Sequence, residues 1–131
     1  MATHATGSFK IEAWDEDSYA ETPDGGKLTR ASVRQTFAGD LEGDGSVQWL
    51  MAYRPDRTAH FVGLQHVAGR LGGRSGEFVL ETTGVFDGKE AHGEWTVVPG
   101  TGTGELRGLR GTGGFTAPHG EASVTLDYEF E

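Results

Sequence analysis

Carboxylate and histidine side chains are the first candidates for chemistry, because paired carboxylates serve acid–base catalysis and histidines bind metal ions. Glu81 and Glu94 are expected on neighbouring strands, one step out of direct register and facing solvent. His60 and His66 lie about 20 Å apart along one extended strand, and His92 belongs to a strand one removed. This spacing predicts surface groups, no metal site, and no assignable catalytic residue.

A glycine-rich stretch, residues 99–115 (PGTGTGELRGLRGTGGF), could bind phosphate. A phosphate or dinucleotide loop needs a preceding strand and a following helix in a βαβ unit. The stretch has no such context, and no lysine stands at the P-loop position. We therefore expect a loop with one helical turn, capped by Thr103, whose Leu106 and Leu109 plug one end of the fold.

Segment 40–45 (DLEGDG) resembles the start of a calcium loop. The calcium-loop pattern requires a bidentate Glu at its twelfth position, where this chain has Met51. The segment is therefore predicted to be a hairpin turn. No cofactor is expected elsewhere either, and the chain has no cysteine for a thiol nucleophile, a disulfide or a cysteine metal site.

Composition excludes several classes of partner. The 131 residues include 20 Asp and Glu against 11 Lys and Arg, giving a net charge of −9. An acidic chain repels phosphate backbones, so no nucleic-acid partner is expected. No apolar run reaches the roughly 18 residues of a membrane span, and the N-terminus lacks the basic start and apolar stretch of a signal peptide. The sequence predicts one cytoplasmic domain over residues 1–131, without membrane contact.

Apolar and polar residues alternate with period two between turn residues, which predicts an all-β chain. The expected strands are residues 5–15, 27–39, 46–54, 58–70, 74–86, 89–98, 110–117 and 122–131. Short connections favour antiparallel neighbours, and closure removes exposed sheet edges. The predicted fold is a closed eight-stranded antiparallel meander barrel with a plug at one end. Residues 15–26 are expected to form an acidic, solvated loop.

Tight turns at 54–58, 71–74 and 86–89 predict which face is inside, because their pairings place one set of residues on one face. Glycines lie beside large rings on that face. The inward set is Phe9, Ile11, Val33, Gln35, Phe37, Trp49, Met51, Tyr53, Ala59, Phe61, Gly63, Gln65, Val67, Phe78, Leu80, Thr82, Gly84, Ala91, Gly93, Trp95, Val97, Val124, Leu126, Tyr128 and Phe130.

The outer face has an apolar stripe, Val62, Leu64, Val79 and Val85. Such a stripe could be the interface of a homodimer or other homo-oligomer. The alternative is scattered apolar surface residues, which are common.

The predicted interior combines aromatic rings with a few polar groups, which suits a small apolar ligand held by one or two hydrogen bonds. The candidate ligand-binding residues are Gln35, Trp49, Tyr53, Gln65, Thr82, Trp95 and Tyr128. A packed core is the alternative, because eight strands leave an interior that side chains fill or that holds one small ligand. Three hypotheses follow: a binding protein, an isomerase or cyclase of an apolar substrate, and an interaction protein with a packed core.

Several segments carry a resemblance to a known family: LTRASVRQTFAGDLEGDGSVQWLMAY, GGRSGEFVLETTGVFDG, GEWTVVPGTGTGELRGLRGTGGF and the terminal LDYEF. Over nearly its whole length the chain is similar to the bacterial domain-of-unknown-function family 3224. WTVVPGTGTGELRGLRG is the most specific part. The family resembles allene oxide cyclase in fold, which implies a closed eight-stranded barrel. By analogy, barrels of this type include cyclases and isomerases that act on apolar substrates in the lumen.

Overall fold

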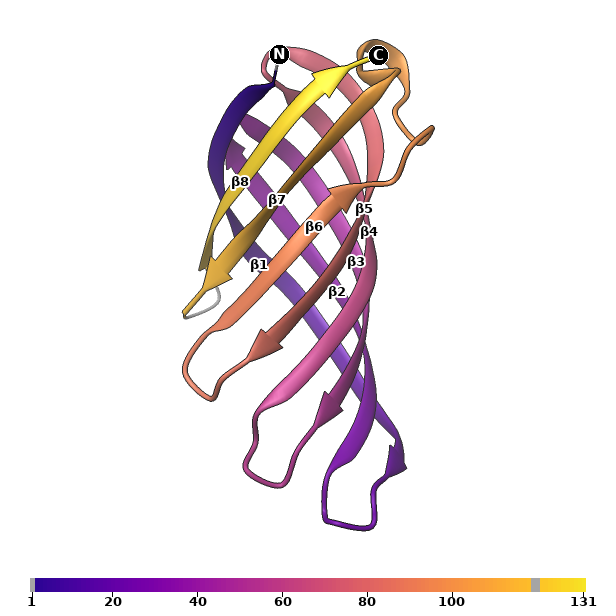
Figure 1. Ribbon diagram of the computed structural model, residues 1–131, viewed down its shortest axis with the longest axis vertical. Coiled ribbons are helices and arrows are strands. Elements are labelled where there is room, and N and C mark those ends of the chain that lie inside the picture. The colour runs from indigo at the N-terminus through magenta and orange to yellow at the C-terminus, as the bar shows by residue number, and fades with distance from the viewer. Residues whose placement is uncertain (1, 119–120) are drawn as a thin grey trace.

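Eight antiparallel strands follow one another around a closed barrel in the computed structural model, which describes residues 2–118 and 121–131 (Figure 1). The strands are β1 (Thr3–Glu21), β2 (Lys27–Gly39), β3 (Leu41–Tyr53), β4 (Ala59–Leu71), β5 (Arg74–Phe86), β6 (Ala91–Val97), β7 (Leu109–Ala117) and β8 (Glu121–Phe130). β8 pairs with β1 and closes the barrel. The predicted fold class is confirmed.

Helical structure is confined, within the described ranges, to the 3-10 turn η1 (Gly104–Leu106). Among those residues no helix has the length and apolar character that a membrane crossing requires.

Two of the three predicted turn registers are confirmed. Arg54 donates its backbone N–H to Thr58 O at 2.8 Å, and Leu71 pairs with Arg74 across two glycines of positive φ. The third register is wrong by two residues, since Phe86 pairs with Ala91. Oδ1 of Asp87 accepts the N–H groups of Lys89 and Glu90 at 2.9 Å each, which stabilises a longer loop.

A shift of two residues leaves every side chain on its predicted face, because the side-chain period of a strand is two. The predicted interior is therefore mostly buried, and its partly buried members are Ile11, Tyr53, Gly63, Gly84, Ala91 and Phe130. Gly84 and Gly93 lie against the rings of Phe61 and Phe115, and a Cβ at either position would collide with the ring. These glycines make room for rings inside a narrow barrel.

The glycine-rich stretch supplies hydrogen-bond partners to the start of β5, where the shorter β6 has ended. Every second side chain of residues 101–105 (TGTGE) accepts a hydrogen bond from every second backbone N–H at the start of β5. Thr101 Oγ1 accepts from Val79 N at 3.1 Å, Thr103 Oγ1 from Glu77 N at 3.1 Å, and Glu105 Oε1 from Ser75 N at 3.0 Å. Backbone N–H groups of Val98 and Thr103 donate to Val79 O and Glu77 O at 2.9 Å each. Side-chain and backbone groups together thus replace a strand ladder along this edge of β5.

Leu106 and Leu109 are almost fully buried, at 0% and 1% exposure, as expected for a plug. The predicted capping role of Thr103 is wrong. Its side chain caps no turn, because its hydroxyl instead accepts the hydrogen bond from β5.

β1 differs most from expectation. It continues to Glu21, so the predicted acidic loop from Asp15 is mostly strand. The pairing with β2 has a bulge between Ile11 and Ala13. A bulge inserts one extra residue and changes which side chains face inward. Beyond it, Trp14 and Glu16 pair with Val33 and Ala31 and share their inner face.

β3 also begins earlier than predicted, at Leu41, so the tight turn from β2 is centred on Asp40. Asp40 Oδ2 accepts the N–H of Thr6 at 2.9 Å. β2 and β3 form a hairpin, but residues 41–45, which were predicted to be its turn, belong to β3.

The two ends of the barrel differ. The β1–β2 and β3–β4 hairpins extend past the other strands at one end, while both termini and η1 lie at the other (Figure 1). The extended hairpins leave part of their inner surface uncovered: Trp14 is 45% exposed.

The outer apolar stripe is only partly as predicted. Val62, Leu64 and Val85 are exposed, and Leu50 of β3, opposite Val62, adds to the patch. Val79 is half-buried and bonds to the glycine-rich stretch. Association through this patch stays a prediction, which light scattering at low concentration tests.

Candidate ligand-binding cavity

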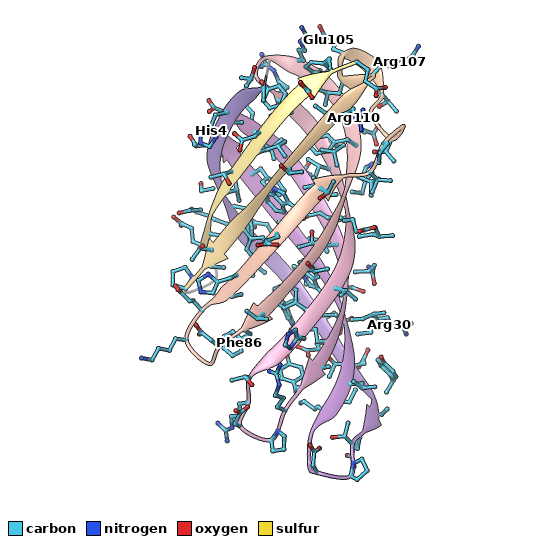
Figure 2. All side chains as sticks on the ribbon, in the orientation of Figure 1. His4, Arg30, Phe86, Glu105, Arg107 and Arg110 are labelled. Atoms are coloured by element: carbon cyan, nitrogen blue, oxygen red, sulfur yellow. The ribbon has the colours of Figure 1, made fainter. Side chains whose placement is uncertain are left out.

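An apolar cavity of about 240 Å³ lies at the end of the barrel with the extended hairpins. Figure 2 labels Phe86, a wall residue, toward that end and Glu105 of η1 at the opposite end. The cavity is lined by Phe9, Ile11, Trp14, Gln35, Trp49, Met51, Tyr53, Phe61, Phe86, Ala91, Phe115 and Ala117. Its wall includes exposed Trp14 and partly exposed Tyr53 and Phe86, and does not include the plug residues Leu106 and Leu109. We call the exposed side of the cavity its mouth.

Phe115 of β7 forms the floor of the cavity. Its ring centroid lies 5.5 Å from that of Phe9, 6.2 Å from Phe61 and 5.5 Å from Trp95. Rings at such separations pack favourably edge-on or offset. This cluster lies between the cavity at the hairpin end and the packed interior toward η1.

The structure divides the seven predicted ligand-binding residues into two groups. Gln35, Trp49 and Tyr53 line the cavity. Gln65, Thr82, Trp95 and Tyr128 are buried but lie outside its wall. Trp95 donates its indole N–H to Thr125 O at 3.0 Å, and Tyr128 reaches the β4–β5 turn at the plugged end.

The polar groups inside the barrel are few and differ in their pairing. Gln65 donates a hydrogen bond through Nε2 to Gln35 Oε1. The hydroxyl of Thr82, fully buried, has no hydrogen-bond partner among the described residues. The Gln35 carboxamide is thus a buried polar group of the cavity wall, and Thr82 is an uncompensated buried hydroxyl.

A hydrogen-bonded cluster centred on Glu16 lies at the mouth. Glu16 Oε2 accepts from Thr29 Oγ1 at 2.6 Å and from the Tyr53 hydroxyl at 2.8 Å. Glu16 Oε1 accepts from Trp14 Nε1 at 2.9 Å. Trp14 and Tyr53 both line the cavity, so the carboxylate belongs to its rim.

Burial and hydrogen bonding shift two pKa values in this cluster. Partial burial raises the pKa of Glu16, but hydrogen bonds from Thr29, Trp14 and Tyr53 and the charge of Lys27 outweigh it and hold the pKa below 4.5. Burial raises the pKa of Tyr53 well above 10.0, and the hydrogen bond and negative charge of Glu16 raise it further. Glu16 is therefore ionised and Tyr53 protonated at neutral pH.

Sequence reasoning missed Trp14 and Glu16 because strict alternation from Phe9 and Ile11 places positions 13 and 15 inward. The bulge shifts the inward positions by one residue. The sequence itself carries no alternation that would reveal the change, because Asp15, Glu16, Asp17 and Ser18 are all polar.

A second group of polar side chains, Asp87, Glu90 and His92, lies in the β5–β6 loop region. Their oxygen and nitrogen atoms are within 4.8 Å of one another, close enough to hold a metal ion. His92 Nε2 lies 2.9 Å from Glu90 Oε1, and Asp87 Oδ1 already accepts two backbone N–H groups. Turn formation and an ion pair account for the group without an ion.

Comparison with known proteins identifies relatives without an assigned activity. The sequence model of the family described as "Protein of unknown function (DUF3224)" matches residues 5–128. The crystal structure of a DUF3224-family protein of unknown function from Shewanella oneidensis MR-1 is similar, with a TM-score of 0.83 and 32% identity. That match covers 100% of this chain and 98% of the other. A search of curated proteins finds no match.

Proposed function

The chain belongs to the DUF3224 family, and from its cavity we propose that it binds a small apolar molecule at the open end of the barrel. The observation that carries this proposal is the aromatic cavity above Phe115, which the barrel leaves unfilled although the rest of its interior is packed. Binding sites for small molecules are typically concave and apolar with a few polar groups.

The size of the cavity limits the ligand. An apolar cavity of about 150 Å³ holds benzene, and drug-sized ligands use roughly 300–1,000 Å³. The volume of about 240 Å³ therefore suits one ring or a short alkyl chain. The Gln35 carboxamide offers one polar contact inside.

Isomerase or cyclase activity is less well supported by the electrostatics of the mouth. An acid–base catalyst works best with a pKa near the working pH. The pKa values of Glu16 and Tyr53 are both shifted away from neutral pH, because that of the carboxyl is lowered and that of the phenol is raised. Glu16 is thus a weak base and Tyr53 a weak acid, which favours a binding role over proton transfer.

Thermal stability and tryptophan fluorescence measured with a panel of small apolar molecules test the proposal. We expect members such as benzene or toluene to raise the melting temperature and to change the emission of Trp14 and Trp49, which line the cavity. Ala117→Leu places a larger side chain in the cavity wall. Thr116→Leu makes a similar change on the exposed outer face and serves as the control.

The expected result is binding to the wild type and to Thr116→Leu, with loss in Ala117→Leu. If no member of the panel changes either signal, or if Ala117→Leu responds like the wild type, the cavity is not the binding site.

A further inference from the structure

The hydrogen-bond donors at the mouth of the cavity all donate to one carboxylate. Trp14 Nε1, Thr29 Oγ1 and Tyr53 OH each donate to Glu16. A carboxylate has about four acceptor positions, so a position on Glu16 Oε1 remains for a ligand. The phenolic oxygen of Tyr53 also retains acceptor capacity. The rim therefore presents acceptors to an incoming head group.

Aromatic faces beside this carboxylate favour a positive charge. Trp14 and Tyr53, which both donate hydrogen bonds to Glu16, line the cavity together with Trp49, and ring faces attract cations. The chain itself places a cation here, since Lys27 Nζ lies 5.2 Å from the centroid of the Tyr53 ring. Lys27 is exposed, so an ammonium group that takes its place displaces no buried contact.

We propose that the cavity selects small amines: a protonated amino group at Glu16 and the Tyr53 ring, with an apolar body between the mouth and Phe115. This inference rests on the proposed function and adds the chemistry of the head group. A carboxylate ligand would instead meet the Glu16 carboxylate, and the net charge of −9 disfavours anions further. A neutral alcohol can donate to the same acceptor but forms neither an ion pair with Glu16 nor a cation–π contact with Tyr53.

The body of the ligand is limited by the distance and volume between rim and floor. A volume of about 240 Å³ accepts one aromatic ring with a short linker. Benzylamine, benzyl alcohol and benzoate therefore form a matched set of probes, because they share the ring and differ in the charge and donors of the head group.

Titration calorimetry with the three probes tests the inference. We expect benzylamine to bind about tenfold tighter than benzyl alcohol, as a charge-assisted hydrogen bond with a cation–π contact allows, and benzoate to bind weakest. Glu16→Gln should reduce the affinity for benzylamine about tenfold and reduce that for benzyl alcohol by a smaller factor, because the alcohol loses only the charge of the acceptor. Asp17→Asn removes the same charge from an exposed neighbour and should leave the order of the probes intact.

Lys27→Gln gives a second test that leaves the Glu16 hydrogen bonds in place. Removal of the competing cation should strengthen benzylamine binding and leave benzyl alcohol unaffected. Lys27→Gln keeps the test decisive even if Glu16→Gln folds poorly.

The outcomes separate the two proposals. Absence of binding by all three probes contradicts the proposed function itself. Binding of all three with equal affinity, or with benzoate tightest, contradicts only the selection of amines.

Discussion

Replacing one member of the buried Gln35–Gln65 pair by methionine, which has similar length, should destabilise the barrel by an amount that depends on which glutamine remains. The two side chains share a hydrogen bond inside the barrel. Removing one partner leaves the other amide unpaired, and a buried unpaired polar group costs about 1–3 kcal/mol.

The structure predicts an asymmetry between the two single variants. Gln65→Met leaves Gln35, which lines the cavity and can be hydrated from it, so the loss should be near the lower end, about 1 kcal/mol. Gln35→Met leaves Gln65, which is 1% exposed and outside the cavity wall, so the loss should approach about 3 kcal/mol. The double variant removes both polar groups and should be nearly as stable as the wild type.

Urea unfolding of the four proteins measures these free energies, with a constant m-value as the check on two-state behaviour. The single losses of about 1 and about 3 kcal/mol and the nearly neutral double variant correspond to a coupling of about 4 kcal/mol between the two side chains. Additive single effects, or a larger loss for Gln65→Met than for Gln35→Met, would refute the reasoning.

Three further predictions follow from single sites. Thr82→Val should stabilise the fold by roughly 1 kcal/mol, because it removes a buried hydroxyl without a partner among the described residues; a loss of stability in urea would show that the hydroxyl is satisfied. Leu106→Ala and Leu109→Ala should each cost about 2–5 kcal/mol, whereas exposed Arg107→Ala should be neutral; unchanged melting temperatures would show that the leucines are no plug. The pKa of Glu16 in the folded protein lies below 4.5, so its ionised carboxylate stabilises the fold above pH 4.5, and this stabilisation is lost as the pH falls through the lowered pKa. Glu16→Gln should therefore flatten the decline of the unfolding free energy in that acid range. An unaltered pH profile of stability would contradict this.

The fold could be predicted because its determinants are local. Turn residues such as Gly72-Gly73 fix register, and the period of two fixes the inner face even where the β5–β6 register was wrong by two residues. The interior set from Phe9 to Phe130 follows from that parity.

The cavity could be predicted only in part, because its rim depends on a bulge. The residue types between Ile11 and Trp14 do not predict a bulge, yet the bulge turns the Glu16 side chain toward the interior. Which interior residues line a cavity and which are packed is a matter of volume across the barrel. Trp49 and Trp95 both point inward, but only Trp49 lines the cavity.

The role of TGTGE also lay beyond sequence reasoning. Its threonines serve β5, a partner about 25 residues away in the chain, and not the turn that follows them. Local propensity favoured a cap at Thr103, and the tertiary contact with Glu77 prevailed.

A crystal structure under xenon pressure tests the central claim most directly, because apolar cavities take up xenon without any assumption about the natural ligand. We expect xenon density above the Phe115 ring, among Trp49, Met51 and Phe61, with little movement of these side chains. Density absent from this site, with the side chains of Met51 and Phe61 filling it, would contradict the account and establish a packed core.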